Sequence, residues 1–412
     1  MQTQSTRFTV FLGSIGALTS ISIDMSLPAV PAMEHDFGVM TGRGGLTVSL
    51  FLAGYALTPL AAGPLADRFG RRPVLLISLI LFAASALACA MSPSYIMLLV
   101  CRLLQGCASG VSTTLPLAIV RDLFDGSIAR QRISEVTTIN NMMPIVAPIF
   151  GSWLMALGSW RIVFGAQAAF AAAIVVVLLM DFNESLPLAC RQPLHPAQVI
   201  RNYAALMTNR TFVGYSLIYA LTFACMFSFV SSSPLILMQR MGVARSAYTL
   251  IFATIATGTI LGSFSSAMLS RRQRSLHGIV SLGLTLMVIA SFCAATLQLA
   301  DFHRPIAIVV PAYLALFGFG LTGPAITLEA LAPVPHLAGS GSGAQRSILM
   351  IFGSGTSGFL AAYCDRNLVH AELAVTLTMA ATGLAALILY VWLLRGGRDQ
   401  ARVAEQFVER IP

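Results

Sequence analysis

The stretch Gly63-Pro64-Leu65-Ala66-Asp67-Arg68-Phe69-Gly70-Arg71-Arg72 lies between two long apolar runs. Gly70 permits a tight turn that other residues resist. The carboxylate of Asp67 can meet the amides at a helix N-terminus or a nearby arginine. The arginines suit the negatively charged inner surface of a bilayer. The stretch therefore predicts a short ordered loop between two membrane spans; a loop that only fixes topology is the alternative.

The composition of the chain agrees with a membrane protein. Of its 412 residues, 57% are hydrophobic and 10% are charged, whereas soluble domains carry about 25% charged residues. A soluble chain this apolar lacks the polar surface to cover itself. The apolar residues form continuous runs near the ~20 residues that a spanning helix needs. Barrel strands would alternate instead, so we predict a polytopic all-α membrane protein.

The apolar runs number twelve and divide six and six. They cover about residues 8–30, 44–64, 73–92, 95–120, 135–156, 161–181, 211–237, 247–270, 277–299, 306–331, 343–365 and 371–394. The longest polar interval between them spans about 181–210, which is the layout of transporters built from two related halves. We predict an N-terminal six-helix bundle at 1–185, a cytoplasmic linker at 186–210, a C-terminal bundle at 211–394 and a cytoplasmic tail at 395–412.

Arginine sets the predicted orientation. All 25 basic residues are arginine. With the N-terminus inside, 17 lie on the inner side, 6 on the outer side and two, Arg102 and Arg346, within spans. This bias predicts that both termini are cytoplasmic and that the chain is a multi-pass protein of a bacterial inner membrane. A basic balance is also typical of nucleic-acid binding, but these arginines cluster in short loops, so we expect no nucleic-acid partner.

Two charged side chains inside spans are the predicted proton-coupling residues. Arg102 lies about 12 Å along span four at the helical rise of 1.5 Å per residue, and charges at such depth usually mark function. Asp24 and Arg102 both fall in the outer halves of their spans, which run in opposite directions, so the two side chains are able to meet. Burial favours a neutral carboxyl and a nearby arginine favours the carboxylate, which is the competition that a proton carrier needs. A static pair and an arginine that snorkels to the interface are the alternatives.

A few other side chains are candidates for a substrate cavity. These are Gln105, Asn141, Pro148, Tyr219, Phe223 and Gln345. Pro144 and Pro148 remove backbone donors and bend span five, which suits a cavity wall or a passive kink. Tyr215, Tyr219, Phe223 and Phe227 form one stripe on span seven; ordinary packing or lipid contact is the other interpretation. For Glu329, proton handling and a helix-end role stay open.

The loop and span four carry a family resemblance. Gly63 to Arg72 resembles the signature loop Gly-x-x-x-Asp-Arg-x-Gly-Arg-Arg of the major facilitator superfamily. That resemblance implies a role in gating for Gly63, Asp67, Arg68, Gly70, Arg71 and Arg72, as a latch of the inner gate in the outward-facing state. Arg102-Leu103-Leu104-Gln105-Gly106 resembles the Arg-x-x-Gln-Gly motif of the same superfamily, which implies proton transfer.

A closer resemblance is to the bicyclomycin/chloramphenicol-resistance subfamily of drug:proton antiporters. Ser22-Ile23-Asp24-Met25-Ser26-Leu27-Pro28 is similar to its (S/T)-x-Asp-Met-Tyr-Leu-Pro run, with Ser26 in place of Tyr. Ala147-Pro148-Ile149-Phe150-Gly151-Ser152 is similar to its Gly-Pro-x-x-Gly-Gly motif and keeps Pro148 and Gly151. The resemblance implies proton-coupled export of amphipathic small molecules, including antibiotics.

The expected function is therefore secondary transport, with protons, a small-molecule substrate and the lipid bilayer as partners and a monomer as the expected state. Proton-coupled transport of a nucleoside, sugar or amino acid is the alternative, because one fold serves both directions. The chain shows no His-Glu-x-x-His motif, Gly-x-Ser-x-Gly elbow or nucleotide-binding loop, so an enzyme is not expected. Seven cysteines without ligand spacing and six dispersed histidines predict no metal or cofactor.

Overall fold

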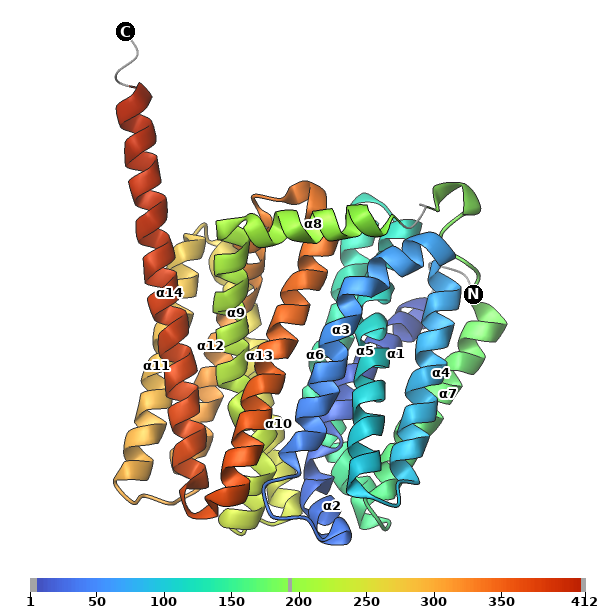
Figure 1. The fold of residues 1–412 in the computed structure, drawn as a ribbon, viewed down its shortest axis with the longest axis vertical. Coiled ribbons are helices and arrows are strands. Elements are labelled where there is room, and N and C mark those ends of the chain that lie inside the picture. Colours follow the sequence, from blue (N-terminus) through green and yellow to red (C-terminus); the bar gives the residue numbers. More distant parts are fainter. Residues whose placement is uncertain (1–5, 192–194, 409–412) are drawn as a thin grey trace.

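The computed structural model describes residues 6–191 and 195–408, and the regular structure within them is entirely helical (Figure 1). The long helices are α1 (Thr6–Asp24), α3 (Gly45–Phe69), α4 (Arg71–Ala90), α5 (Tyr95–Leu123), α6 (Gly126–Ala156), α7 (Arg161–Asp181), α9 (Arg210–Ser233), α10 (Arg245–Arg271), α11 (Leu276–Leu299), α12 (Ile306–Leu331), α13 (Ala338–Arg366) and α14 (Ala371–Val408). Two shorter α-helices are α2 (Val30–Phe37) and α8 (Pro196–Thr208). Single-turn or π segments are η1 (Leu27–Ala29), η2 (Leu188–Cys190), η3 (Pro234–Arg240), η4 (Pro335–Leu337) and η5 (Leu368–His370).

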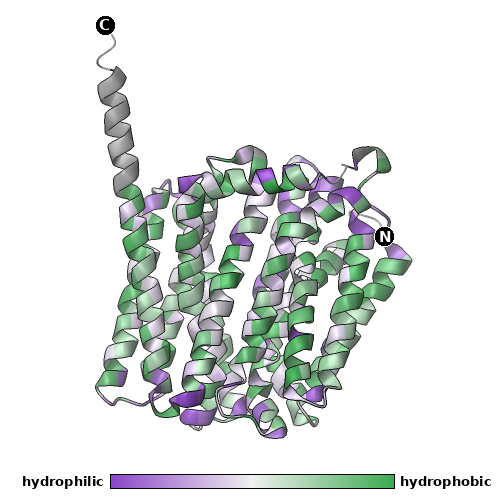
Figure 2. Cartoon of the chain, in the orientation of Figure 1, coloured by the Kyte–Doolittle hydropathy of each residue, from purple (hydrophilic) through white to green (hydrophobic). Residues whose placement is uncertain are grey.

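Eleven helical segments of the described chain are long and apolar enough to cross a membrane. The remaining long helix is α6, whose first half carries Arg130, Arg132, Glu135, Asn140 and Asn141. It packs against α1 and α10 within the bundle all the same. Figure 2 shows apolar residues along the helices and polar residues gathered at their ends. The predicted all-α membrane bundle is confirmed.

The first span is broken near its outer end. Helix α1 stops at Asp24, and η1 and α2 continue the segment to Phe37, beyond the end predicted near residue 30. Pro28 and Pro31 stand at the starts of η1 and α2, where a missing amide hydrogen costs little. The hydroxyl of Ser26 donates to the carbonyl oxygen of Ile23 at 2.8 Å and helps to satisfy the end of α1.

The bundle consists of two halves, α1 to α7 and α9 to α14. Helix α3 packs against α13 and α6 packs against α10, and these two pairs form most of the junction between the halves. Helix α8 lies across one end of the bundle and contacts α9 and α13 (Figure 1). We call this end, which also carries the loop 63–72, the inner end, following the predicted orientation, and the opposite end the outer end.

The last long helix extends further than its predicted span. The sequence predicts a span at 371–394 followed by a tail, whereas α14 stays helical through Val408 and projects past the inner end (Figure 1). Residues 409–412 of the predicted tail lie outside the described residues. The domain boundaries drawn from the sequence remain predictions.

Candidate functional site

The two halves are fastened together at the outer end. Arg43, just before α3, pairs through Nε with Oδ2 of Asp365 on α13 at 3.0 Å. Further towards the middle of α3 and α13, the hydroxyl of Ser49 donates to the carbonyl oxygen of Ser354 at 2.8 Å, and the hydroxyl of Ser354 donates to the carbonyl oxygen of Ser49 at 2.9 Å. Such reciprocal bonds hold α3 and α13 in one register.

Glu34 is the centre of this outer closure. Its Oε1 accepts the amide hydrogens of Gly42 at 2.9 Å and Gly44 at 2.6 Å, and its Oε2 accepts from Nε2 of Gln239 in the other half at 2.6 Å. The carboxylate is 4% exposed, so these charge-assisted bonds replace its lost hydration.

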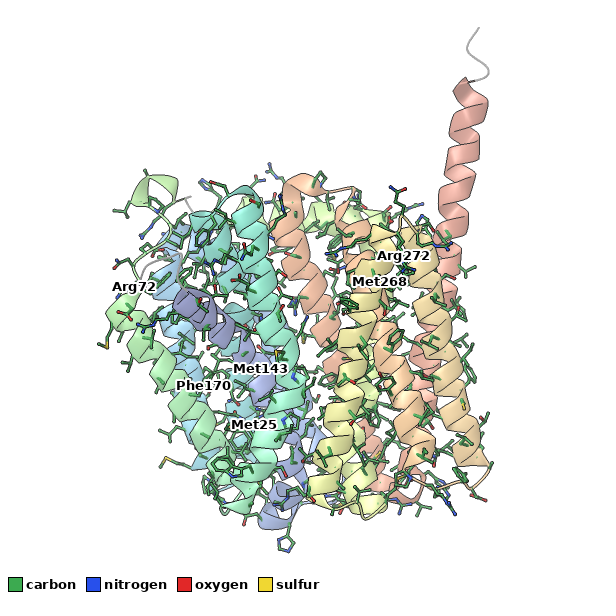
Figure 3. All side chains as sticks on the ribbon, turned by 180° about the vertical axis from the view of Figure 1, so that it is seen from behind. Met25, Arg72, Met143, Phe170, Met268 and Arg272 are labelled. Atoms are coloured by element: carbon green, nitrogen blue, oxygen red, sulfur yellow. The ribbon has the colours of Figure 1, made fainter. Side chains whose placement is uncertain are left out.

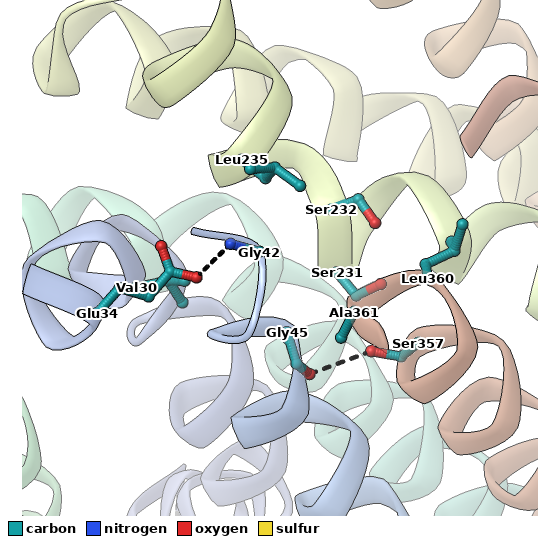
Figure 4. A pocket seen from close by; sticks show the side chains of 10 residues that line it. All are labelled: Val30, Glu34, Gly42, Gly45, Ser231, Ser232, Leu235, Ser357, Leu360 and Ala361. Atoms are coloured by element: carbon teal, nitrogen blue, oxygen red, sulfur yellow. Dashed lines mark hydrogen bonds between the residues drawn. The ribbon is translucent and has the colours of Figure 1, made fainter. Parts of the chain in front are cut away.

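A small pocket remains beside Glu34, between the halves (Figure 4). It is lined by Val30, Glu34, Gly42, Gly45, Ser231, Ser232, Leu235, Ser357, Leu360 and Ala361. Figure 4 shows Glu34 reaching Gly42, and the hydroxyl of Ser357 donating to the carbonyl oxygen of Gly45 at 3.3 Å. Residues of both halves line this pocket, so the two halves meet around it at the outer end.

The ion pairs of the inner loop stay within the N-terminal half. The guanidinium of Arg71 pairs with Oδ1 of Asp67 at 2.6 Å and with Oδ2 of Asp122, at the end of α5, at 2.9 Å. The side chain of Asp67 is 44% exposed. The loop therefore ties α3 to α5 in this conformation.

Glu184 is the acid that receives the first amides of α4. Its carboxylate accepts from the backbone N–H of Arg71 at 2.8 Å and of Arg72 at 3.2 Å, where the helix dipole favours a negative charge. Of the two partners expected for Asp67, the structure shows the arginine, Arg71. The helix amides are bound by Glu184 instead. Gly70 has φ 100° and ψ 158°, and a Cβ there would overlap the Glu184 carboxylate.

The other loop residues have separate places. The guanidinium of Arg68 lies over the ring of Phe69 at 5.0 Å, and Nη2 of Arg72 donates to the carbonyl oxygen of Leu179 at 3.1 Å. A Cβ on Gly63 would meet open space. Figure 3 shows Arg72 of α4 and Arg272, which follows α10, towards the same end of the molecule.

Arg102 lies in a fully buried polar network of the N-terminal half. Its side chain donates to the carbonyl oxygen of Thr47 at 3.1 Å, the hydroxyl of Ser22 at 2.8 Å and Oε1 of Gln105 at 2.8 Å. Gln105 in turn donates to Oε1 of Gln167 at 2.9 Å. Gln105 is 0% exposed, so it belongs to this network rather than to an open cavity wall.

Two aromatic rings complete the surroundings of Arg102. Its guanidinium carbon lies 4.6 Å from the ring centre of Phe51 and 5.6 Å from that of Phe164, and cation–π attraction of this kind partly compensates a desolvated cation. Nη2 has no hydrogen-bond partner among the described residues. The arginine is therefore held by dipoles and ring faces.

Asp24 stands alone at the break after α1. Its side chain is 7% exposed, and within residues 6–191 and 195–408 it forms no ion pair or hydrogen bond. The phenol of Tyr248, on α10 of the other half, lies close enough to Asp24 for an electrostatic interaction. The adjoining η1 packs against α6 and α10, so Asp24 lies at the junction between the halves.

Asp24 and Arg102 do not pair in this conformation, contrary to the contact that the sequence allows. Arg102 instead donates to Ser22, two residues before Asp24, through the Ser22 hydroxyl and, at 3.3 Å, the Ser22 carbonyl oxygen. Hydropathy places both residues at similar depth but says nothing of how each helix is rotated about its axis. That rotation aims Arg102 into its own half and leaves Asp24 at the junction.

Helix α6 presses against the break that carries Asp24. A Cβ on Gly151 would overlap the carbonyl oxygen of Met25, so this position accepts only glycine at the observed separation. Pro148, one turn earlier, is buried, as is its neighbour Ala147. The pair Pro148 and Gly151 therefore shapes the packing around Asp24, and Pro148 faces protein rather than open space.

The remaining cavity candidates differ in exposure. Asn141 is exposed on α6, whereas Gln345 is buried on α13 and its Nε2 has no partner among the described residues. Tyr219 is half-buried and stacks on Phe319 with ring centres 5.5 Å apart. Phe223 is buried and stacks on Phe227 at 5.1 Å. These rings form one aromatic cluster between α9 and α12.

Tyr215, the first ring of the predicted stripe, turns away from that cluster. It packs against Tyr390 with ring centres 6.4 Å apart. Glu329 lies near both of these tyrosines, within the C-terminal half. Of the predicted stripe, Tyr215 therefore belongs to the core of the C-terminal half, whereas Phe223 lies at the junction between the halves.

Sequence reasoning missed three acids that organise the outer closure and the inner loop: Glu34, Asp122 and Glu184. Each lies next to a predicted span end, within reach of the arginine-bearing loops. Charge complementarity with Arg71 would have drawn attention to Asp122 and Glu184. No comparable signal exists for Glu34, because its partners are backbone amides and a glutamine.

The twelve-helix bundle and its inner loop define a secondary transporter fold. Residues 12–358 match the Major Facilitator Superfamily, and the chain belongs to this family. The chain is 27% identical over 384 residues to the multidrug resistance protein MdtL of Klebsiella pneumoniae, covering 93% of this chain and 95% of MdtL. It is 30% identical over 260 residues to MdtL of Escherichia coli K12, covering 63% and 66%.

Other relatives and solved structures agree on the fold. An uncharacterized MFS-type transporter of Bacillus subtilis, YdgK, is 28% identical over 346 residues, covering 83% of this chain and 85% of YdgK. A D-xylose–proton symporter structure aligns with TM-score 0.73 at 16% identity, covering 93% and 97% of the two chains. An inward-facing, occupied bacterial homologue of the lysosomal transporter Spinster aligns with TM-score 0.74 at 18% identity, covering 96% and 98%.

Proposed function

We propose that this protein is a proton-coupled secondary transporter that exports small amphipathic molecules, drugs among them, by alternating access. In this proposal it is a monomer of a bacterial inner membrane with both termini in the cytoplasm, and it resembles the bicyclomycin/chloramphenicol-resistance subfamily. The relatives named multidrug resistance protein support the export of drugs. Proton-coupled transport of a metabolite such as a nucleoside, sugar or amino acid is the alternative, and the D-xylose–proton symporter among the fold neighbours is compatible with it.

The observation that carries the proposal is the isolation of Asp24. A buried carboxylate without a cation or a hydrogen-bond donor is costly to ionise, so its charge state responds to small changes in its surroundings. Asp24 lies where η1 meets α10 of the other half. Rocking of the halves would change its hydration and couple proton uptake to the movement.

Arg102 has a supporting role in this proposal. Its four hydrogen bonds, donated by Nε and Nη1, hold Ser22, Thr47 and Gln105, and the Ser22 contacts hold the end of α1 from which Asp24 projects. We propose that Arg102 positions this end and thereby tunes proton exchange at Asp24. The gate at 63–72 would re-form across the halves when the outer side opens.

The test is drug-induced proton movement in sealed, energised vesicles. Wild type, Asp24→Asn and Asp301→Asn are compared with a panel of drugs and nucleosides; Asp301 is an exposed acid near the outer end of α11 and serves as the matched control. We expect drugs to collapse the pH gradient in wild type and in Asp301→Asn, and no drug response above protein-free liposomes in Asp24→Asn. A response to nucleosides alone would move the function to metabolite transport. Equal responses in all three proteins would exclude Asp24 as the coupling residue.

A further inference from the structure

A second arginine within the spans, Arg346, faces the junction between the halves. On α13, Gly343 lies against Pro59 of α3, where a Cβ would touch the carbonyl oxygen. The two helices are antiparallel, so Arg346, one turn after Gly343, meets Tyr55, one turn before Pro59. Its guanidinium therefore lies close to the Tyr55 hydroxyl.

The neighbours of Arg346 come from both halves. Tyr55 also bonds Thr113 of α5 in the N-terminal half, while Tyr219 of α9 lies close to Arg346 in the C-terminal half. Arg346 is nevertheless exposed. A side chain flanked by both halves and still exposed indicates an opening between them at this depth, about 12 Å from the start of α13 at 1.5 Å per residue.

This cation has no acidic partner in the described part of the chain. The ion pairs formed there do not include Arg346, and the phenols of Tyr55 and Tyr219 lie close to it. An unpaired cation between membrane helices is costly and usually functional. Its field would concentrate anions in the opening.

An aromatic surface adjoins the cation. Tyr219 stacks on Phe319 with 17° between the ring planes, and Phe319 lies 5.9 Å from Phe223. Guanidinium binds carboxylate through two parallel hydrogen bonds, and flat rings favour offset stacking on other rings. The arrangement offers an anion site and a ring site side by side.

We propose that Arg346 and Tyr219 select the substrate, and that the preferred substrates are planar aromatic anions such as aromatic carboxylates. Arg346 binds the acidic group, Tyr55 orients the guanidinium, and the Tyr219–Phe319 stack receives the ring. This inference rests on the proposed transport function and specifies its substrate class. It assigns recognition to the C-terminal half and leaves proton exchange with Asp24 in the N-terminal half.

The experiment measures ligand binding without a proton gradient. Thermal unfolding of the purified full-length protein in detergent is followed with matched pairs: 2-naphthoate against 2-naphthamide, and cinnamate against cinnamamide. We expect stabilisation by the carboxylate of each pair. In Arg346→Gln the apparent affinity for the carboxylates should fall roughly tenfold or more, as expected for a lost charge-assisted bond. Arg346→Lys should fall between, and Arg366→Gln, a charge removed from the outer end of the same helix, should match wild type.

Other results would overturn the proposal. Unchanged binding of the carboxylates in Arg346→Gln would exclude anion recognition by Arg346. So would a wild-type protein that binds the amide of each pair as tightly as the carboxylate, or more tightly. If Arg346→Gln fails to fold, two measurements still test the proposal: the affinity of Arg346→Lys for the carboxylates, and the preference of the wild-type protein for the carboxylate over the amide of each pair. Asp24→Asn should keep Arg346-dependent binding. Binding without any proton movement in vesicles would therefore refute the proposed coupling and leave the substrate class intact.

Discussion

The hydroxyl of Tyr203 donates a hydrogen bond of 2.8 Å to the carbonyl oxygen of Leu60, the carbonyl that Pro64 leaves without its helical donor. Proline lacks the amide hydrogen that would bond four residues back. Tyr203 belongs to α8, in the segment that links the halves, and Leu60 belongs to α3, just before the inner loop. The linker thus supplies the donor that the helix in the N-terminal half lacks. In the same way, the hydroxyl of Ser263 donates at 3.2 Å to the carbonyl oxygen of Gly320 on α12, four residues before Pro324.

The bond between Tyr203 and Leu60 predicts a specific coupling with Pro64. Tyr203→Phe should destabilise the protein by about 1 kcal/mol, because the Leu60 carbonyl loses its donor. In a Pro64→Ala background the restored amide satisfies that carbonyl, so the same substitution should cost much less. Thermal unfolding of the two single variants and the double variant gives the coupling energy. Equal costs of Tyr203→Phe in both backgrounds would show that the bond is dispensable.

Gly70 predicts an asymmetry between two glycines of one motif. Its φ of 100° and ψ of 158° belong to a region that other residues enter at a cost of about 1–3 kcal/mol. Gly70→Ala should therefore lower the unfolding temperature and displace Glu184 from the amides of Arg71 and Arg72. Gly63→Ala, in a helix with open space around it, should be neutral or slightly stabilising. Thermal unfolding of the two variants side by side tests this, and similar losses would refute the backbone argument.

The sequence predicted the helices better than their contacts. Continuous apolar runs identify spans because the bilayer demands them, and the loop 63–72 marks the inner end through its glycine and charges. Hydropathy does not report how a helix is rotated, so the sequence left open whether Asp24 and Arg102 meet, and in this conformation they do not. It also does not report breaks such as the one after Asp24, where prolines and Ser26 redirect the chain.

The residues of the candidate site were likewise predictable from the sequence only where their character, and not their packing, marks them. Asp24 and Arg102 were found because charge inside an apolar run is conspicuous. Gln345 and Arg346 are neighbours in sequence, and only the packing of α13 on α3 shows that Gln345 is buried while Arg346 is exposed. Glu34 escaped notice because backbone amides, which leave no trace in a sequence, are its main partners.

The geometry around Arg102 predicts that its shape matters as well as its charge. Arg102→Lys keeps the cation but replaces a planar fork by one compact ammonium, which cannot reach Thr47, Ser22 and Gln105 together. We expect a loss of about 1–3 kcal/mol from the acceptors left unsatisfied, seen as a lower unfolding temperature in detergent. Arg130→Lys, an exposed arginine on α6, is the control. Wild-type stability of Arg102→Lys would mean that charge alone suffices.

The outer closure predicts a gate that opens when its bonds across the halves are removed. Arg43→Gln combined with Glu34→Gln removes the pair with Asp365 and weakens the bonds to Gln239, Gly42 and Gly44. Loss of about 1–2 kcal/mol of closure would raise the open population roughly fivefold or more. A cysteine at Ser232, which lines the outer pocket and is 7% exposed, would report it in an otherwise cysteine-free protein through its rate of labelling by a membrane-impermeant maleimide.

The matched control for the outer gate is Arg240→Gln. Arg240 also forms an ion pair near the outer end, with Glu372 at 3.1 Å, but both partners belong to the C-terminal half. Its removal should leave the labelling rate of the Ser232→Cys reporter unchanged, because no bond between the halves is lost. Faster labelling in Arg240→Gln as well would trace the effect to general loosening of the outer end. Unchanged labelling in the Arg43 and Glu34 double variant would show that the packing of α3 on α13 closes the gate by itself.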